Sequence, residues 1–547
     1  MMNGTKHDPH KNQANFTIKD NILIGKKMVH PETHNNVGDI ILEIFQKKPD
    51  LVGQIDAATG KQVTYREMRE RTIKCAIWLK EQGIKPGDVV GICTSCHFDN
   101  YVPFLASIYI GAICAVEYHE LPTRVFQHFL STVSPKVIFL HEFAVENFDA
   151  AQNELNTKIQ RIVFEDGVPN EVSLNDILKN RKLSEVEKFR CAKIEDPKQT
   201  VMYIGTSGST GTPKMAELSH LSFKTMLHPD YAIFAKDSVS LCIAGLRWIY
   251  CILFMMEAFR GNSTRVIVDD YKEAKYYGEV IKKYKVEYYG ADTNQIRQIY
   301  KLGLIELYRS TNLKTIRFGG SPFSRDIHKA MNELLPRINL LQAYGSTDVG
   351  NCITGQTNKN FKPGGCGYVR EGVKVKIVST ETGEALGPNK QGEICVMTDT
   401  QLKGYLKNPE ATKKAIDSKG WVHTGDIGYY DDDGEVFIVG RMSDFIKYKD
   451  CCLSVTEMET ILERHPSVYR AAVVAVPAEL EGELPVAFVI KVPNKEVTES
   501  ELMKHFESNM PDYYTLSDVK FLGKIPTTNT GKVAKNELKQ KLSNGML

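Results

Sequence analysis

The segment Thr206–Lys214, TSGSTGTPK, combines the residue types that bind phosphate. It directly follows the apolar, strand-like run TVMYIG, so consecutive backbone amides and hydroxyl groups can turn toward an anion, and Lys214 adds a positive charge. This pattern predicts a site that grips a triphosphate. Its candidate binding residues are Thr206, Ser207, Gly208, Ser209, Thr210 and Gly211, and Lys214 is a candidate catalytic residue.

Two alternatives to this interpretation can be weighed from the residues. The P-loop pattern GxxxxGK does not match, because Pro213 stands where that pattern needs its second glycine. A Ser/Gly-rich surface loop without a ligand is the other alternative. The segment is therefore a phosphate-loop candidate, but not one of the P-loop kinase type.

Three later segments carry charged groups beside hydroxyl or aromatic residues. Tyr344–Asp348 reads YGSTD, Trp421–Gly428 reads WVHTGDIG, and residues 526–535, PTTNTGKVAK, contain Lys532. A flexible lysine can neutralise charge that develops during a reaction. Each segment alone is also compatible with a turn, a capped loop or a basic tail.

Taken together and in this order, the segments resemble the signatures of the adenylate-forming superfamily, which includes acyl-CoA synthetases and firefly luciferase. The resemblance covers nearly the whole chain from about residue 40. It implies an AMP-forming ligase that activates a carboxylic acid, fatty or aromatic, as its acyl-adenylate and then forms a thioester. ATP, Mg²⁺ and coenzyme A are the cofactors that it implies.

The resemblance also assigns roles around the nucleotide. The backbone of GGSP would lie along the adenine, and the tyrosine of YGSTD would stack on it. The residues counted with the adenine site are Gly319, Gly320, Ser321, Tyr344, Gly345 and Ser346. In YGSTD, Thr347 would meet the α-phosphate as a catalytic residue, and Asp348 would hold the magnesium ion.

The remaining roles fall in the C-terminal third of the chain. Asp426 and Arg441 would bind the ribose hydroxyls, and Lys532 would bridge the substrate carboxylate and the α-phosphate. A hinge follows Arg441, and the loop beyond it, which begins at Lys447, would admit coenzyme A after a rotation of the small domain. Lys447 is counted with the cofactor-binding candidates.

The sequence departs from the family pattern at several of these positions. Asp348 replaces the usual glutamate, which draws the carboxylate back by roughly 1.5 Å, and Ser443 stands at the hinge. In the loop KYKDCCLSVTEME, Asp450, Cys452 and Val455 replace glycine, glutamine and proline. Three functions follow: a CoA ligase, an adenylating enzyme without CoA ligation, or a non-catalytic nucleotide-binding relative.

The stretch Ile243–Tyr250, IAGLRWIY, corresponds to the acyl-pocket element of luciferases but contains no histidine, so light production is not expected. Arg247 within it could pair with a second carboxylate of a dicarboxylic substrate, since an unpaired buried charge is costly. The favoured alternative is that Arg247 pairs with an acid of the protein or faces solvent.

The elements that must position these groups alternate in type. Residues 63–87 have the capping-box spacing of Thr64 and Glu67 and predict a helix, and the uncharged run Tyr101–Val116 predicts a buried helix. Short β-branched runs such as GDVVGIC and KTIRFGG favour a layered α/β body with mostly parallel sheets. We expect a poorly ordered tail over 1–36, an adenylation domain over 37–440 with a β-rich part from about residue 365, and a small α+β lid over 441–547.

Composition and the chain termini indicate which partners and which cellular compartment to expect. The chain has 547 residues and a net charge of +2, which favours neither nucleic acid nor a membrane surface, and a monomer or weak oligomer is expected. The N-terminus lacks a signal peptide, and no run is long enough to span a membrane. Twelve scattered cysteines favour a reducing compartment, and the terminal NGML favours the cytosol over the peroxisome. Cys93, Cys96 and His97 match the haem-attachment pattern, but free thiols are the better interpretation without export.

Overall fold

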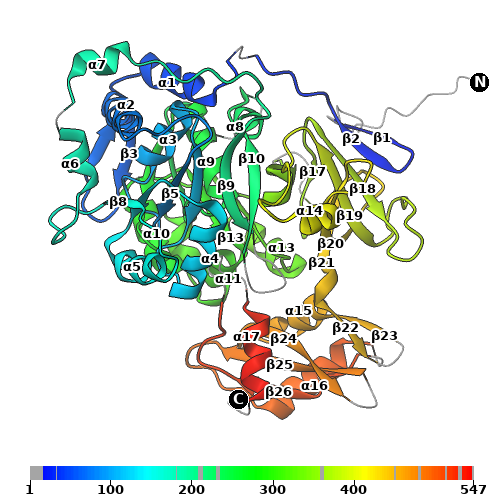
Figure 1. Ribbon diagram of the computed structural model, residues 1–547. Helices are drawn as coiled ribbons and strands as arrows, with labels where there is room; N and C mark the ends of the chain where they lie inside the picture. Colours follow the sequence, from blue (N-terminus) through cyan, green and yellow to red (C-terminus); the bar gives the residue numbers. More distant parts are fainter. Residues whose placement is uncertain are drawn as a thin grey trace, which may run out of the picture.

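A large α/β body and a small C-terminal domain make up the computed structural model (Figure 1). It describes residues 16–31, 34–179, 181–206, 213–229, 234–357, 362–448, 451–478, 482–511, 514–527 and 533–544. The predicted site residues Ser207, Gly208, Ser209, Thr210, Gly211 and Lys532 lie outside this part of the chain. The predicted α/β class with mostly parallel sheets is confirmed.

One sheet ends at the predicted phosphate loop. Its order is β10-β9-β6-β5-β7-β8, and only the β9–β10 pair is antiparallel. The strands are β5 (Val89–Cys93), β6 (Ile113–Glu117), β7 (Val137–Leu140), β8 (Gln160–Val163), β9 (Thr200–Thr206) and β10 (Lys214–Ser219). The carboxyl ends of the parallel strands meet at the edge where β9 leads into the loop.

A nine-stranded sheet carries the predicted adenine segments. Its order is β17-β16-β15-β14-β13-β11-β12-β3-β4, parallel from β15 to β3 and antiparallel at both ends. The strands are β3 (Val52–Asp56), β4 (Gln62–Thr64), β11 (Val239–Cys242), β12 (Thr264–Ile267), β13 (Tyr288–Asp292), β14 (Thr315–Gly319), β15 (Asn339–Ser346), β16 (Asn351–Gly355) and β17 (Tyr368–Val369). GGSP and YGSTD follow or end the neighbouring parallel strands β14 and β15, so both lie at one edge.

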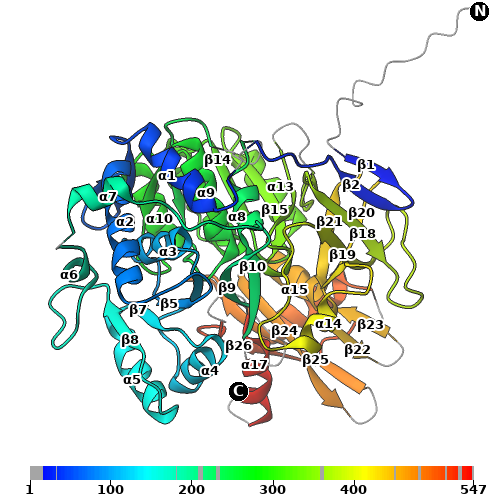
Figure 2. The same cartoon turned by 45° about the horizontal axis from the view of Figure 1, so that its top comes forward.

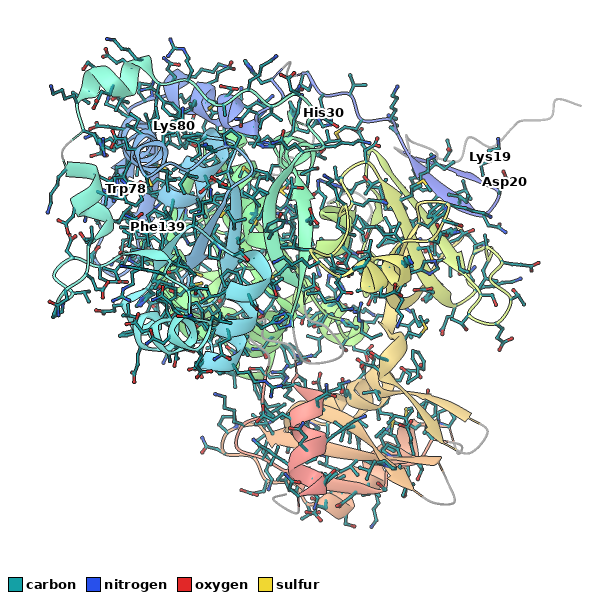
Figure 3. All side chains as sticks on the ribbon, in the orientation of Figure 1. Lys19, Asp20, His30, Trp78, Lys80 and Phe139 are labelled. Atoms are coloured by element: carbon teal, nitrogen blue, oxygen red, sulfur yellow. The ribbon has the colours of Figure 1, made fainter. Side chains whose placement is uncertain are left out.

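A six-stranded antiparallel sheet forms the expected β-rich part, in the order β1-β2-β18-β19-β20-β21. Its strands are β1 (Phe16–Lys19), β2 (Ile22–Gly25), β18 (Val373–Val378), β19 (Gly392–Thr398), β20 (Val422–Tyr430) and β21 (Val436–Arg441). Because β2 pairs with β18, residues 16–25 are folded, and the prediction of a poorly ordered tail is wrong for them. Lys19 and Asp20 lie at this hairpin, beside the β-rich sheet (Figure 3).

Most helices of the large body surround the two parallel sheets, and the last helix of this body packs against β20 of the antiparallel sheet. In the order of the chain they are α1 (Val37–Lys47), α2 (Tyr65–Glu81), α3 (Tyr101–Tyr109), α4 (Thr123–Val133), α5 (Val145–Glu154), α6 (Leu174–Lys179), α7 (Leu183–Lys188), α8 (His220–Met226), α9 (Ile249–Gly261), α10 (Ala274–Lys283), α11 (Thr293–Lys301), α12 (Ile305–Arg309), α13 (Arg325–Leu334) and α14 (Pro409–Ala415). Side chains fill the layers between helix and strand: Trp78 of α2 meets Phe139 of β7 edge to face, with ring centroids 6.2 Å apart (Figure 3).

The two helix predictions had different outcomes. Helix α2 begins after Thr64, whose hydroxyl accepts the Glu67 amide while the Glu67 carboxylate accepts the Thr64 amide, so the predicted capping box is confirmed. The run Tyr101–Val116 is buried, but only its first half is helical. After α3 the chain turns at Gly111, which has φ of +71°, and continues as strand β6. No helix among the described residues is long and apolar enough to cross a membrane.

The small C-terminal domain packs a five-stranded sheet against three helices. The strands are β22 (Phe445–Tyr448), β23 (Cys451–Ser454), β24 (Val468–Ala478), β25 (Gly482–Lys491) and β26 (Asp518–Phe521), and the helices are α15 (Val455–Arg464), α16 (Glu499–Asn509) and α17 (Lys535–Ser543). Helix α15 faces the large body. Glu463 pairs with Arg297 of α11 at 3.0 Å, and Arg464 pairs with Asp326 of α13 at 2.7 Å (Figures 1 and 2).

Candidate nucleotide site

A bulge in β20 places Asp426. On β19 the pairing advances two residues, from Glu393 to Cys395, while on β20 it advances four, from His423 to Ile427. The extra residues bend the strand and change the direction of its side chains. Gly425, in the bulge, has φ of +68°, a conformation that glycine adopts without strain.

Asp426 joins two segments that are far apart in the sequence. Its Oδ2 accepts a hydrogen bond of 2.6 Å from the Tyr344 hydroxyl, and its Oδ1 lies 2.8 Å from Arg441 Nη1. The same Nη1 donates to the carbonyl of Thr424 at 2.8 Å. A carboxylate has about four lone-pair sites, so the group can still accept hydrogen bonds from a ligand.

Burial and charge fix the protonation of this network. Burial raises the pKa of Tyr344 well above its ordinary value, and the neighbouring Asp426 raises it further, so the phenol stays a donor. Burial disfavours the charged form of Arg441, but Asp426 outweighs it and raises the pKa of the guanidinium. The result is a neutral phenol and a cation bound to one carboxylate.

Asp348 lies in a short 3-10 turn, Thr347–Val349, which follows β15 and is capped by the Ser346 side chain. Burial raises the pKa of the Asp348 carboxyl, and a hydrogen bond from Tyr405 together with the charges of Arg441 and Lys214 opposes this shift. The Oδ1 atom is shielded from solvent and has no hydrogen-bond partner among the described residues.

This arrangement fits a magnesium ion. A shielded carboxylate oxygen without a partner is the ligand type that Mg²⁺ takes, usually one or two carboxylates with substrate phosphates. Thr347 precedes the carboxylate in the same turn. Asp348 Oδ1 is therefore available as a ligand for the magnesium ion that the sequence resemblance implies.

Thr206 and Lys214 flank the predicted phosphate loop and pair with each other across β9 and β10. The Thr206 hydroxyl donates to the Lys214 carbonyl at 3.3 Å. The Lys214 ammonium lies 5.2 Å from the ring centroid of Tyr405, whose hydroxyl reaches Asp348. The structure thus brings both ends of the loop to the same place as Asp348.

Tyr405 was not predicted from the sequence. It is held by an isolated bridge to Ala216 of β10, and burial raises the pKa of its phenol above the ordinary value. Its ring lies next to the Lys214 ammonium and its hydroxyl binds Asp348, so Tyr405 connects the strands of the phosphate loop with that carboxylate. A lone tyrosine in an irregular segment gave no signal of this position, because its neighbours in space are distant in the sequence.

The GGSP segment turns tightly beside β15. A Cβ atom on Gly319 would lie 2.5 Å from the Ala343 carbonyl oxygen, and Gly320 has φ of +98°, so both positions favour glycine. The Ser321 and Thr293 hydroxyls lie 2.5 Å apart. At Gly345, a Cβ would lie 2.9 Å from the Asn351 carbonyl oxygen. Close backbone contacts therefore shape the predicted adenine wall.

Arg247 is paired inside the protein. Its Nε forms an ion pair with Oε1 of Glu117, at the end of β6, and the Glu117 side chain is 1% exposed. Burial raises the pKa of Glu117, and Arg247 opposes that shift. The favoured prediction, that Arg247 pairs with an acid of the protein, is confirmed.

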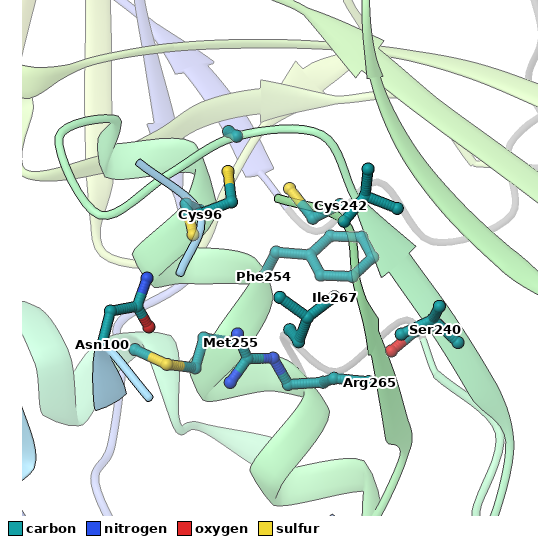
Figure 4. A pocket seen from close by; sticks show the side chains of 12 residues that line it. Cys96, Asn100, Ser240, Cys242, Phe254, Met255, Arg265 and Ile267 are labelled. Carbon is teal, nitrogen blue, oxygen red and sulfur yellow. The ribbon is translucent and has the colours of Figure 1, made fainter. Parts of the chain in front are cut away.

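An enclosed cavity of about 20 Å³ lies next to the Ile243–Tyr250 stretch (Figure 4). Cys96, Cys242 and Arg265 line it (Figure 4). It has room for about one water molecule. Burial lowers the pKa of Arg265, whose Nη1 donates to Gln54 Oε1 at 3.3 Å. The cavity is too small for an acyl chain in this conformation.

The hinge region is tied to the C-terminal domain. Lys535 lies 3.3 Å from Asp444 and 3.2 Å from Glu459, and these two charges outweigh burial to raise its pKa. Lys447 is in β22, and its backbone pairs with Cys452 of β23. The expected coenzyme A loop therefore begins on an antiparallel pair of strands, and residues 449–450 between them lie outside the part of the chain that the structure describes.

Two family models and several known proteins match this chain. The model of the AMP-binding enzyme family matches residues 43–406, and that of the AMP-binding enzyme C-terminal domain matches residues 457–532. A 4-coumarate–CoA ligase of Humulus lupulus is 29% identical, with 99% of each chain covered. Another from Oryza sativa subsp. japonica is 30% identical over 90% of this chain and 89% of its own.

A solved structure is also similar. The luciferase-like enzyme from the nonluminescent Zophobas morio mealworm superposes with a TM-score of 0.70 at 28% identity, over 77% of this chain and 99% of that one. The family models, the relatives and the arrangement of Tyr344, Asp426, Arg441 and Asp348 lead to one conclusion. The chain belongs to the AMP-binding enzyme family.

Proposed function

We propose that the chain is an ATP-dependent acid–thiol ligase that forms an acyl-adenylate and transfers the acyl group to coenzyme A. The observation that supports this most is the shared carboxylate of Asp426, bound by Tyr344 and Arg441 beside Asp348 and Lys214. These groups lie close to one another and have the chemistry that adenine, ribose and phosphates would need, which supports the proposal. The relatives named as 4-coumarate–CoA ligases support the same activity.

In the proposed first step, a carboxylate oxygen of the acid attacks the α-phosphorus of ATP, and pyrophosphate leaves. Such transfers depend mainly on positioning and on charge neutralisation. Thr206–Gly211 and Lys214 would surround the leaving pyrophosphate, and Asp426 and Arg441 would fix the ribose. Thr347 and Lys532 would act at the reacting centre.

A magnesium ion bound at Asp348 would supply positive charge against the phosphates. The protein's part is to hold the carboxylate in place: Tyr405 donates to it, and the charges of Arg441 and Lys214 oppose the rise in its pKa that burial causes. In the second step the thiol of coenzyme A attacks the acyl carbonyl, and AMP leaves. The loop that begins at Lys447 would admit the thiol.

The proposed acid is apolar and carries one carboxylate. Arg247 is already neutralised by Glu117, so it offers no free cation for a second carboxylate. The ring of Trp248 adds apolar surface beside Gly320 of the predicted adenine wall, where a Cβ on that glycine would lie 3.7 Å from it. An aromatic acid is favoured because the relatives act on 4-coumarate by name.

The two-domain division and the setting of the enzyme are part of the proposal. We place the adenylation domain at 37–440 and the mobile lid at 441–547, acting as a monomer or weak oligomer without nucleic acid. Each cysteine whose side chain is described is free, which suits a reducing compartment. We propose the cytosol, with the peroxisome as the alternative.

Two other functions are kept because of the substitutions in the coenzyme A loop. An adenylating enzyme without CoA ligation is favoured by the substitutions Asp450, Cys452 and Val455. The further substitutions Asp348 and Ser443 favour a nucleotide-binding protein without catalytic activity. Pyrophosphate exchange over a panel of aromatic and fatty acids separates the three. A ligase exchanges pyrophosphate and releases AMP only with coenzyme A, an adenylating enzyme exchanges without a thioester, and a binding protein exchanges nothing.

A further inference from the structure

Three metal-ligand side chains meet on the β-rich sheet, on the strands that lead to Asp426. Glu393 and Cys395 are two residues apart on β19 and share one face, and His423 of β20 pairs directly with Cys395. The His423 Nδ1 lies 2.7 Å from Glu393 Oε2 and 3.6 Å from Cys395 Sγ. All three possible ligand atoms lie within 4.8 Å of one another.

These separations suit a tetrahedral metal ion. With Zn–N near 2.0–2.1 Å and Zn–S near 2.3 Å, a nitrogen and a sulfur ligand stand about 3.5 Å apart. The separation of His423 Nδ1 and Cys395 Sγ, 3.6 Å, already matches. The nitrogen and oxygen ligands would stand about 3.3 Å apart. The carboxylate of Glu393 therefore has to withdraw by a fraction of an ångström and give up its hydrogen bond to the imidazole.

The other nitrogen of His423 faces a carboxylate. Its Nε2 lies 3.8 Å from Asp417 Oδ2, and Asp417 is itself held by the backbone amides of Lys419 and Trp421, each at 2.8 Å. Imidazoles that bind metals almost always donate their second N–H to such an acceptor, which orients the ring. Asp417 is therefore placed to orient a metal-bound His423.

Charge and access also favour a divalent cation. Ionised Glu393 and Asp417 carry two negative charges, and Cys395 adds a third once a metal displaces its proton. Lys376, which pairs with Cys395 from β18, carries one positive charge. The Lys376 ammonium lies over the Trp421 ring, 4.4 Å from its centroid. Burial alone would raise the pKa of Asp417, but the backbone amides of Trp421 and Lys419 and the charge of Lys376 lower it. The His423 side chain is 33% exposed, so an ion and a water ligand can enter from that side.

A second cluster, made of His97, His141 and Glu165, does not offer a metal site, because its imidazole rings are oriented differently. Nε2 of His97 and of His141 lie 3.8 and 3.4 Å from Glu165 Oε1. The Nδ1 atoms of these rings accept hydrogen bonds from the Asp99 and Phe143 amides, so in the neutral rings Nε2 carries the proton. The backbone amides at Nδ1 keep the proton of each ring on the nitrogen that faces Glu165, so neither ring has a lone pair for a metal there. In His423 the proton on Nδ1 can move to Nε2, because that nitrogen faces the Asp417 carboxylate.

We propose that Glu393, Cys395 and His423 bind a divalent transition-metal ion of the zinc class, with Asp417 orienting the imidazole and water as the fourth ligand. The ion bridges β19 and β20 and so stabilises the strand that carries Asp426. Binding releases the thiol proton of Cys395 to solvent, while the proton on Nδ1 of the neutral imidazole moves to Nε2, where Asp417 accepts it. Because one proton is released, zinc affinity rises with pH. The site is separate from the proposed reaction and does not depend on it.

Zinc and cobalt(II) binding by the full chain tests this proposal. The chelator-treated protein should bind one zinc ion after dialysis, and cobalt(II) should give the thiolate-to-cobalt charge-transfer absorption of a cysteine ligand. Cys395→Ser should lose both signals. The matched control is Cys366→Ser, which removes another buried thiol of the same body and should bind metal as the wild type does.

Asp417→Asn keeps all three ligands and should weaken zinc binding by about 10–100-fold while keeping the cobalt absorption. Circular dichroism establishes that each variant is folded. If Cys395→Ser does not fold, the cobalt spectra of the wild type and Asp417→Asn decide instead. Equal zinc uptake by folded wild type and Cys395→Ser, or a cobalt spectrum without the thiolate band, overturns the proposal.

Discussion

The Tyr344 hydroxyl donates a 2.6 Å hydrogen bond to Oδ2 of Asp426, although the two residues lie on strands of different sheets. Tyr344 lies near the C-terminal end of β15, the last parallel strand of the nine-stranded sheet. Asp426 projects from the bulge of β20. Their contact therefore joins the predicted adenine wall to the predicted ribose site. The other carboxylate oxygen binds Arg441, the last residue before the hinge region.

Tyr344→Phe should weaken ATP binding and leave the fold intact. The substitution removes one hydrogen bond to a charged group, worth about 1.5–3 kcal/mol, which corresponds to roughly a 10–100-fold higher KM for ATP. The measurement is pyrophosphate exchange as a function of ATP concentration. Tyr430→Phe is the control, because that hydroxyl donates to the Leu386 carbonyl, at 3.4 Å, and not to Asp426. Equal KM values for the two variants would show that the Tyr344 contact does not position the nucleotide.

Asp348→Glu should increase the adenylation rate or lower the Mg²⁺ concentration that half-saturates it. The longer side chain extends the carboxylate by roughly 1.5 Å toward the phosphates. Asp348→Asn should have the opposite effect, because an amide cannot supply the negative charge that a magnesium ion binds. Magnesium titrations of pyrophosphate exchange measure both. If neither variant alters the magnesium dependence, Asp348 does not hold the ion.

Glu257→Gln should destabilise the large body. Glu257 binds Arg317 through two hydrogen bonds, of 2.9 and 2.7 Å, and both side chains are buried. Removing one charge leaves the other without its partner, at a cost of about 3–5 kcal/mol. Urea unfolding at fixed pH measures the loss. The exposed pair Glu306–Arg309 supplies the control, since Glu306→Gln should change stability by less than about 1 kcal/mol.

Glu435 should make the protein less stable as pH rises through neutrality. Burial raises the pKa of its carboxyl to about 7, so between about pH 4.5 and 7 the folded chain binds more protons than the unfolded chain. The free energy of unfolding then falls with rising pH, by up to about 3 kcal/mol over this range. Glu435→Gln should remove that part of the pH dependence. A variant with the wild-type pH profile would assign the slope to other groups.

The sequence predicted the elements better where a local signal was present. The Thr64 and Glu67 spacing located α2, because a capping box is made within one turn. Tyr101–Val116 gives no such signal, because a run that is buried throughout has neither the helical nor the strand period. The helix prediction is therefore wrong for its second half, which forms strand β6.

The site shows the same division. The sequence segments around Asp426 and Tyr344 identified both as candidate site residues. The contact between them could not be predicted, because it depends on the bulge at Gly425 and on the packing of two sheets. Glu117, the partner of Arg247, and Tyr405 were not foreseen. Both reach the site from segments that give no local signal, because their partners are distant in the sequence.

The central claim is that the carboxylate of the acid becomes bonded to the α-phosphorus of ATP. It is tested most directly by supplying a substrate acid labelled with oxygen-18 in its carboxylate, together with ATP and coenzyme A. The account predicts that one labelled oxygen appears in AMP, because the acyl carbon–oxygen bond breaks when the thiol attacks. Labelled inorganic phosphate with ADP, or unlabelled AMP formed alongside the thioester, would contradict it.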